Sequence, residues 1–235
     1  MNMTPLSGSN KIVVVGGGAA GMMAAGMAAQ AGAQVTLLEQ NGRLGKKLLI
    51  TGKGRCNVTN DCPWQDVLQN VPTNPRFLYS ALAGFSPADA KNFFEAYGCA
   101  LKTERGNRVF PVSDRSQTVL DALEQFLREH HVCVLPRRAE QIAVSDGRVT
   151  GVIIRDAQNG NKYIQLNAAK GVILATGDNS GDEKIMKHFA PEVVEKQIMN
   201  MGAMGMLGVD VEGKTVETGD GLRMGAWIGA KVQDF

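Results

Sequence analysis

A strand followed directly by spaced glycines constrains this chain more than any other feature of its sequence. Residues 11–15 form a short β-branched run that is typical of a buried parallel strand. Three glycines with the spacing G-x-G-x-x-G follow it at once: Gly16, Gly18 and Gly21. Residues 19–30 then favour a helix of small side chains, and residues 34–39 favour a second buried strand. This order predicts a βαβ unit that opens a parallel sheet.

The glycine spacing has a physical reason in a nucleotide site. The first glycine permits a tight turn, the second lets the backbone approach a pyrophosphate, and the third lets the helix pack closely on the strand. The helix N-terminus, at Ala19 and Ala20, offers backbone N–H groups and a partial positive charge to the phosphates. A glycine-rich structural turn is the alternative explanation of the motif.

The second part of the predicted site is an acidic residue at a strand end. Glu39 lies 18 residues after Gly21, where a carboxylate accepts hydrogen bonds from ribose hydroxyls, and Gln40 lies beside it. An ordinary surface glutamate is the alternative. The glycines and Glu39 together predict a dinucleotide-binding site.

The charge composition of the chain narrows the classes of partner that it is expected to bind. The 235 residues include 25 basic and 23 acidic side chains, and a net charge of +2 is too small to suggest a nucleic-acid partner. The chain is long enough for one large α/β domain, or one domain and part of a second. Basic residues are concentrated in one glycine-rich loop, where a bound pyrophosphate explains them better than a nucleic-acid backbone does. They are Arg43, Lys46, Lys47, Lys53 and Arg55.

The cysteines and the hydropathy of the chain indicate the cellular compartment in which the protein is expected. The four cysteines are Cys56, Cys62, Cys99 and Cys133. They form no CxxC pair and no metal-ligand spacing with the three histidines. We therefore expect reduced thiols, a cytoplasmic protein and no metal site. Residues 12–29 are almost uncharged, but the glycines at 16–18 interrupt them. We therefore expect neither a membrane span nor a signal peptide.

The remaining elements are expected from periodicity and turn signals. Helices are predicted at 86–97, 116–131, 182–189 and 219–230, and strands at 132–135, 139–144, 149–155, 163–166 and 171–174. Asp146-Gly147 and Asn159-Gly160 mark hairpin turns. Residues 41–60 are expected to form a long loop, and residues 200–208 show no clear period.

Two segments carry a resemblance to a known family. Residues 51–60, TGKGRCNVTN, match the TGxGRCNxTN hallmark of the BaiN-like bacterial FAD-binding flavoproteins, also called aminoacetone-oxidase-like. Residues 107–114, NRVFPVSD, resemble that family's GRVFPxSD segment, with Asn107 in the glycine position. The resemblance implies that the dinucleotide is FAD. A plain NAD dehydrogenase would instead continue from Glu39 into further βα units.

The loop that carries the hallmark supplies a set of candidate cofactor contacts: Gly45, Lys46, Lys47, Thr51, Gly52, Arg55, Cys56 and Asn57. Its glycines let the backbone lie against the cofactor, and its basic side chains can offset phosphate charge. Thr51 and Asn57 can hydrogen-bond the ribityl chain or the flavin edge. For Cys56 a small buried packing residue is favoured over a redox thiol, and for Lys53 a solvated surface charge is favoured.

The C-terminal part resembles a second group of flavoproteins. Residues 171–177, GVILATG, match the apolar strand that returns beneath the cofactor in FAD proteins, which implies contacts at Ala175, Thr176 and Gly177, with Ala139 near the adenine. Residues 218–230, TGDGLRMGAWIGA, resemble the fumarate-reductase and ketosteroid-dehydrogenase flavoproteins. Asp220 is expected either to face the flavin or to cap the following helix. Asp178 stands where these families have glycine.

The expected architecture is α/β: a Rossmann-like FAD-binding domain with a parallel sheet, helices and a smaller antiparallel β-hairpin layer. It is predicted over residues 1–177, with a helical insertion near 61–131. Residues 178–235 are expected to be an incomplete continuation, because related flavoproteins go on into a capping or substrate domain. The chain is therefore expected to be truncated or part of a larger enzyme.

The predicted function is that of an FAD-dependent oxidoreductase acting on an unsaturated or keto small molecule, with a nicotinamide or flavin electron donor. A non-catalytic FAD-binding fragment and an NAD-dependent dehydrogenase remain as alternatives. The sequence identifies no catalytic acid or base: His130 and His131 end a predicted helix, where a solvated C-terminal charge is the common role, and His188 lies in another predicted helix.

Overall fold

The computed structural model describes residues 10–156, 160, 162–177, 182–189, 191 and 218–231. The expectations for residues 200–208, Asp178 and Asn159 lie outside these described residues. Contacts divide the chain into two compact units, of which unit 1 comprises residues 1–44 and 127–235 and unit 2 comprises residues 45–126.

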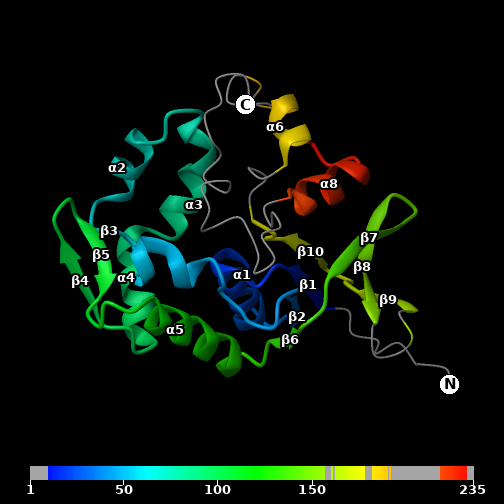
Figure 1. The fold of residues 1–235 in the computed structure, drawn as a ribbon, viewed down its shortest axis with the longest axis horizontal. Coiled ribbons are helices and arrows are strands. Elements are labelled where there is room, and N and C mark those ends of the chain that lie inside the picture. Colours follow the sequence, from blue (N-terminus) through cyan, green and yellow to red (C-terminus); the bar gives the residue numbers. More distant parts are fainter. Residues whose placement is uncertain are drawn as a thin grey trace. The chain divides into compact units, whose positions relative to one another are not determined.

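A four-stranded parallel sheet lies at the centre of unit 1 (Figure 1). Its strands, in the order β10-β1-β2-β6, are β10 (Gly171–Leu174), β1 (Lys11–Val15), β2 (Gln34–Leu38) and β6 (Cys133–Leu135). Helix α1 (Ala19–Gln30) connects β1 to β2. Val13, Val14 and Leu37 are fully buried, as expected for strands covered on both faces. The predicted βαβ unit is confirmed.

The antiparallel layer of unit 1 is also confirmed. Strands β7 (Ala139–Ser145), β8 (Arg148–Asp156) and β9 (Lys162–Asn167) pair in sequence order, and the β7–β8 ribbon stands out in Figure 1. Asp146 and Gly147 both have positive φ, which suits a tight hairpin turn. Ile142 and Val152 pack in one hydrophobic core with Val13 of the parallel sheet. Helices α6 (Glu183–Phe189) and α8 (Asp220–Trp227) complete the described part of this unit.

Unit 2 combines short helices with a small antiparallel sheet in the order β3-β5-β4. Its elements are η1 (Leu48–Gly54), β3 (Thr59–Asn60), α2 (Trp64–Gln69), η2 (Pro75–Leu78), α3 (Tyr79–Gly84), α4 (Pro87–Ala96), β4 (Leu101–Glu104), β5 (Arg108–Pro111) and α5 (Ser116–Glu129), of which α5 continues for its last three residues into unit 1. Phe126 of α5 lies 4.9 Å from Phe93 and 5.2 Å from Tyr97 of the α4 segment, measured between ring centroids. Phe126 is buried in the core of the unit, and the half-buried rings of Phe93 and Tyr97 pack on it.

Helix α4 begins as its sequence predicts. The Ser86 hydroxyl accepts a hydrogen bond from the Asp89 amide, and the Asp89 carboxylate accepts one from the Ser86 amide. Pro87 occupies the first helical position, where its missing N–H costs nothing. This capping box fixes where the helix starts.

The structure differs from the sequence-based expectation at several places. The loop expected at residues 41–60 contains the 3-10 helix η1 and the short strand β3. Helix α5 ends at Glu129, two residues before the expected end, because His131 adopts a positive φ of 55°. The segment 61–131 contains the β4–β5 hairpin as well as helices, and these four-residue strands are too short to show a period. No helix within the described ranges is long and apolar enough to cross a membrane.

Candidate functional site

The first and third glycines of the G-x-G-x-x-G motif in unit 1, Gly16 and Gly21, allow one backbone segment to pack closely on another. Gly16 has a φ of +106°, and a Cβ there would lie 2.3 Å from the Ala175 carbonyl oxygen. A Cβ on Gly21 would lie 1.8 Å from the Gly16 carbonyl oxygen. The Gly16 amide also donates to the Leu38 carbonyl oxygen at 2.8 Å. Helix α1 therefore lies against the strand ends β1, β2 and β10 at a distance that only glycine allows.

The second glycine lies in a different environment. Gly18 is the N-cap of α1 in an extended conformation, and no protein atom lies within 4 Å of a Cβ placed on it. No side chain caps this helix, and its first turn holds no acidic residue. Ala19 and Ala20 are exposed at the same end. The N-terminus of α1 thus presents backbone N–H groups to an anion, as a pyrophosphate site requires.

Glu39 is held beside the glycine turn by three donors. Its Oε2 accepts from the Gly17 amide at 2.7 Å, and its Oε1 accepts from the Asn41 amide at 2.8 Å and from Asn41 Nδ2 at 2.7 Å. A carboxylate has about four acceptor positions, so Glu39 retains capacity for a ribose hydroxyl. Gln40 is exposed next to it. Sequence reasoning missed Asn41, whose signal is an amide two residues after a strand-end acid.

The end of β10 contributes the other predicted contacts of unit 1. The Ala175 amide donates to the Val15 carbonyl oxygen at 2.8 Å, and Gly177 has a φ of +90°. A Cβ on Gly221 would lie 2.2 Å from Thr176 Oγ1, so the start of α8 packs on this loop. Ala139 begins β7 and contacts the hydrophobic core.

Asp220 is not the cap of α8. Gly219, with a φ of +63°, occupies the cap position, and no side chain caps this helix. Asp220 is the first helical residue instead, where its Oδ1 accepts from the Thr218 hydroxyl at 3.0 Å and its Oδ2 lies 3.4 Å from Arg138. The cap alternative from the sequence is therefore wrong, while the flavin-facing alternative stays a prediction.

The hallmark loop of unit 2 follows an unusual backbone path. Gly52, Lys53, Gly54 and Cys56 all have positive φ, between 55° and 82°. Thr51 Oγ1 donates to the Leu48 carbonyl oxygen at 2.7 Å, and the Cys56 amide donates to the Thr51 carbonyl oxygen at 3.1 Å. These bonds close the loop on itself.

Gly45 and the two lysines after it begin the same region. Gly45 has a φ of +64°, and a Cβ there would lie 2.7 Å from Leu120 Cδ1. The absence of a side chain at Gly45 therefore lets Leu120 of α5 pack closely on this backbone. Lys46 is exposed and Lys47 is half-buried. Their predicted contact with phosphate stays a prediction.

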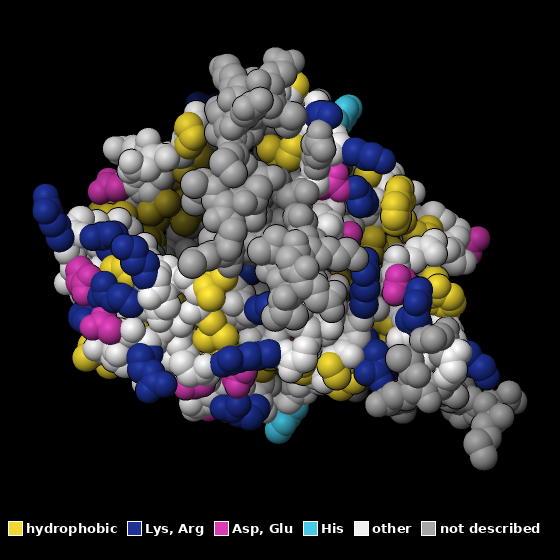
Figure 2. Space-filling view, viewed as in Figure 1, with side chains coloured by type: hydrophobic (Ala, Val, Ile, Leu, Met, Phe, Trp, Pro, Cys, Tyr) yellow, Lys and Arg dark blue, Asp and Glu magenta, His cyan; other side chains and the backbone are white. Residues whose placement is uncertain are grey.

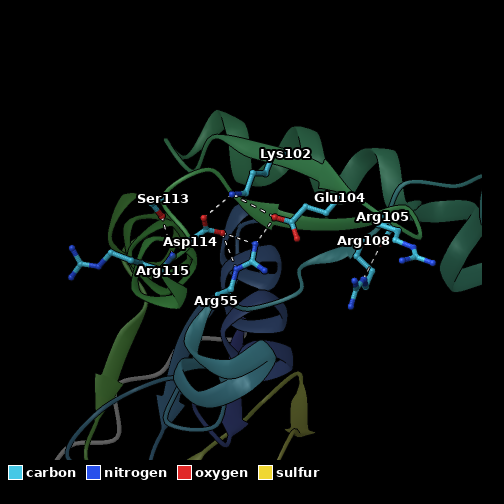
Figure 3. A network of polar contacts seen from close by, with 8 residues as sticks. All are labelled: Arg55, Lys102, Glu104, Arg105, Arg108, Ser113, Asp114 and Arg115. Atoms are coloured by element: carbon cyan, nitrogen blue, oxygen red, sulfur yellow. Dashed lines mark hydrogen bonds and ion pairs between the residues drawn. The ribbon is translucent and has the colours of Figure 1, made fainter.

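Arg55 lies in a cluster of four charged side chains (Figure 3). Its Nη2 donates to Glu104 Oε1 at 2.5 Å and to Asp114 Oδ1 at 2.6 Å, and its Nε donates to the same Asp114 oxygen at 2.8 Å. Lys102 Nζ donates to Asp114 Oδ2 at 2.7 Å. The guanidinium carbon lies 4.2 Å from the centre of the Phe110 ring. The charge of Arg55 is thus compensated within unit 2.

These contacts shift the titration of both carboxyl groups. The hydrogen bond from Arg55 lowers the pKa of Glu104, and hydrogen bonds from Lys102 and then Arg55 lower the pKa of Asp114. Both acids are therefore charged at neutral pH. Figure 2 shows basic and acidic side chains interspersed on this side of unit 2, which is a mixed surface and not a single-signed one.

The cysteines are free, and two are buried in unit 2. Burial raises the pKa of the Cys56 thiol, and it raises the pKa of Cys99 to about 11. Both groups are therefore protonated thiols at neutral pH, in agreement with a packing role for Cys56. Among the described residues, no cluster of three or more His, Cys, Asp or Glu side chains could hold a metal ion.

Thiol reactivity in the native protein is expected to follow these environments. Iodoacetamide should modify the exposed Cys133 first and should leave Cys56 and Cys99 unmodified until the protein unfolds. Peptide mass spectrometry after a timed pulse measures the three rates, and a pulse in denaturant is the control. Labelling of Cys56 as fast as that of Cys133 would contradict the packing role.

A protein-family model and two known proteins match most of this chain in sequence. The family model described as "HI0933-like protein Rossmann domain" matches residues 10–218. The 3-dehydro-bile acid delta(4,6)-reductase of Clostridium scindens is 37% identical over 171 residues, covering 72% of this chain and 39% of that protein. The ribosomal RNA dihydrouridine synthase of Haemophilus influenzae is 34% identical over 177 residues, covering 70% of this chain and 39% of that protein. The chain thus spans about two fifths of the length of these relatives.

Solved structures share the fold. The 3-ketosteroid-delta4-(5alpha)-dehydrogenase of Rhodococcus jostii RHA1 matches with a TM-score of 0.68 and 18% identity, covering 97% of this chain and 56% of that one. A flavocytochrome c3 fumarate reductase matches with a TM-score of 0.61 and 23% identity, covering 94% and 41%. Both resemblances drawn from the sequence are confirmed, and so is the predicted Rossmann-type fold.

Proposed function

The chain belongs to the HI0933-like family of flavin-dependent oxidoreductases with an FAD-binding Rossmann domain, and from this premise we propose that the whole protein transfers a hydride between FAD and a carbon–carbon double bond conjugated to a carbonyl group. The observation that carries the proposal is the nucleotide cradle of unit 1: an uncapped helix N-terminus, a glycine turn and a strand-end carboxylate. FAD is the cofactor of this family, so the NAD-dependent alternative is set aside.

The residues of unit 1 fit the adenosine and pyrophosphate part of FAD. The amides of Ala19 and Ala20, with the open side of Gly18, would hold the pyrophosphate, and Glu39 would hold the ribose. FAD, when bound, supplies the ring that exchanges a hydride with substrate. The chain's own contribution is to bind and orient it. The other proposed contacts are Gln40, Ala139, Ala175, Thr176, Gly177 and Asp220 of unit 1, and Gly45, Lys46, Lys47, Gly52 and Cys56 of unit 2.

The substrate class is proposed from what the relatives' names share. The Clostridium scindens relative is a delta(4,6)-reductase of a 3-dehydro-bile acid, that is, it reduces ring double bonds of a keto steroid. Ketosteroid dehydrogenase and fumarate reductase act on a bond next to a carbonyl or carboxyl group. An unsaturated keto small molecule is therefore the first candidate.

Uridine in RNA is the second candidate, because two relatives are ribosomal RNA dihydrouridine synthases. Dihydrouridine also arises by reduction of a ring double bond conjugated to a carbonyl group. The small net charge of +2 and the mixed charges on the face of unit 2 seen in Figure 2 favour the small molecule. We further propose a nicotinamide or flavin electron donor and a cytoplasmic location, the latter in keeping with four free cysteines.

A single anaerobic experiment separates these possibilities. The chain is loaded with FAD, the flavin is reduced with dithionite, and an unsaturated keto steroid, fumarate or a uridine-containing RNA is added. Return of the oxidised flavin absorbance band with the keto compound supports the proposal, and return only with RNA supports the second candidate. Bound flavin that no acceptor oxidises indicates a non-catalytic FAD-binding unit. A chain that takes up no FAD overturns the proposal.

A further inference from the structure

On the basis of the proposed FAD function, we propose that Thr51, Arg55 and Asn57 are positioning residues. Their side chains hold the loop of residues 51–57 in its left-handed path, and the loop meets the cofactor through its backbone. This differs from the direct side-chain contacts to phosphate, ribityl chain and flavin edge that the sequence suggests for the same residues.

The polar side chains of the loop are engaged inside unit 2. The Thr51 hydroxyl donates to the Leu48 carbonyl oxygen at 2.7 Å. With its amide oriented to satisfy both neighbours, Asn57 Nδ2 donates to the carbonyl oxygens of Thr59 and Val109, each at 3.1 Å. The Val58 amide donates to the same Val109 oxygen at 2.9 Å. The end of the loop is therefore attached to strand β5.

Arg55 attaches the middle of the loop to the second hallmark segment. Asp114, which receives two of its hydrogen bonds, lies 59 residues away in sequence, and Glu104 lies 49 residues away. The Phe110 ring beneath the guanidinium belongs to the same segment as Asp114. A planar guanidinium is suited to this combination of two carboxylates and a ring face, and a lysine ammonium is not.

The backbone gives a reason for so many attachments. Lys53 and Cys56 are not glycines, yet both have a φ of 59°, which costs free energy and persists only when surrounding contacts hold it. The outer edge of the loop stays accessible, because Gly52 and Lys53 are exposed and a Cβ on Gly54 would meet no atom closer than 4.0 Å. The side chains thus build the loop and leave its backbone edge free for a ligand.

The variant Asp114→Asn separates positioning from direct charge contact, because it leaves the Arg55 cation in place. A direct phosphate contact by Arg55 predicts unchanged or tighter FAD binding once its competitor is neutralised. A positioning role predicts weaker binding and a looser loop. Arg55→Lys tests the geometry of the same contacts, and Arg115→Lys is the matched control, since its side chain points away from the cluster (Figure 3).

Two measurements on the full chain decide the question. Amide hydrogen exchange without cofactor is expected to speed up about three- to tenfold in residues 51–57 of Asp114→Asn and Arg55→Lys, with FAD dissociation constants rising by a similar factor and Arg115→Lys behaving as wild type. Unchanged exchange in residues 51–57, or unchanged or tighter FAD binding by Asp114→Asn, overturns the positioning role. A wild-type chain that binds no flavin contradicts the proposed function instead, and the exchange data still decide whether the side chains hold the loop.

Discussion

Replacing Gly21 with alanine is expected to destabilise unit 1 by about 3 kcal/mol, the upper range for overpacking. The added Cβ would lie 1.8 Å from the Gly16 carbonyl oxygen, and both groups belong to the backbone, so no side chain can rotate away. Helix α1 would have to move off the strand ends. Thermal unfolding followed by circular dichroism measures the loss, and Gly21→Ala should melt well below wild type.

Gly18→Ala is the matched control for this prediction. Its Cβ would meet no protein atom within 4 Å, and its extended backbone suits alanine. We expect an unchanged melting temperature but weaker FAD binding, because the methyl group would occupy the space proposed for the pyrophosphate. A Gly21→Ala chain that melts like wild type would contradict the packing described for the glycine turn.

Replacing Glu39 with alanine is expected to weaken FAD binding about 10- to 100-fold, the range for lost hydrogen bonds to a charged group. The substitution removes the proposed ribose acceptor and also leaves the Gly17 and Asn41 amides without their partner. Isothermal titration of the full chain with FAD measures the change in dissociation constant.

Two further variants sharpen the Glu39 result. Asn41→Ala removes a side-chain donor to Oε1 and keeps the carboxylate, so we expect a smaller loss of FAD affinity than with Glu39→Ala. Glu140→Ala removes an acid of β7 that lies 3.8 Å from Arg155, and should bind FAD as wild type does. Unchanged affinity in Glu39→Ala would show that the ribose assignment is wrong.

The sequence predicts the parts of this fold that depend on local pattern. The β-branched run at Lys11–Val15 predicts a buried strand, and the apolar run at Gly171–Leu174 predicts another; both strands have the predicted bounds. The start of α4 follows from Ser86, Pro87 and Asp89 alone. In each case, the residues that determine the element lie within a few positions of one another.

Long-range contacts explain most of what the sequence did not reveal. The partners of Arg55 lie 49 and 59 residues away, so no spacing in the hallmark segment indicates that its charge is compensated. The packing role of Gly45 depends on Leu120, which the fold brings to it. Helices α2 and α3 contain no buried residue, so they show no apolar face from which to predict them.

The central claim is that the pyrophosphate of FAD binds at the N-terminus of α1 in unit 1. Titration of the isotope-labelled full chain with FAD, followed by backbone amide NMR, tests it most directly. The account predicts that the amides of Gly18, Ala19 and Ala20 shift most within unit 1. Saturable FAD binding that leaves these three amides unshifted would contradict it.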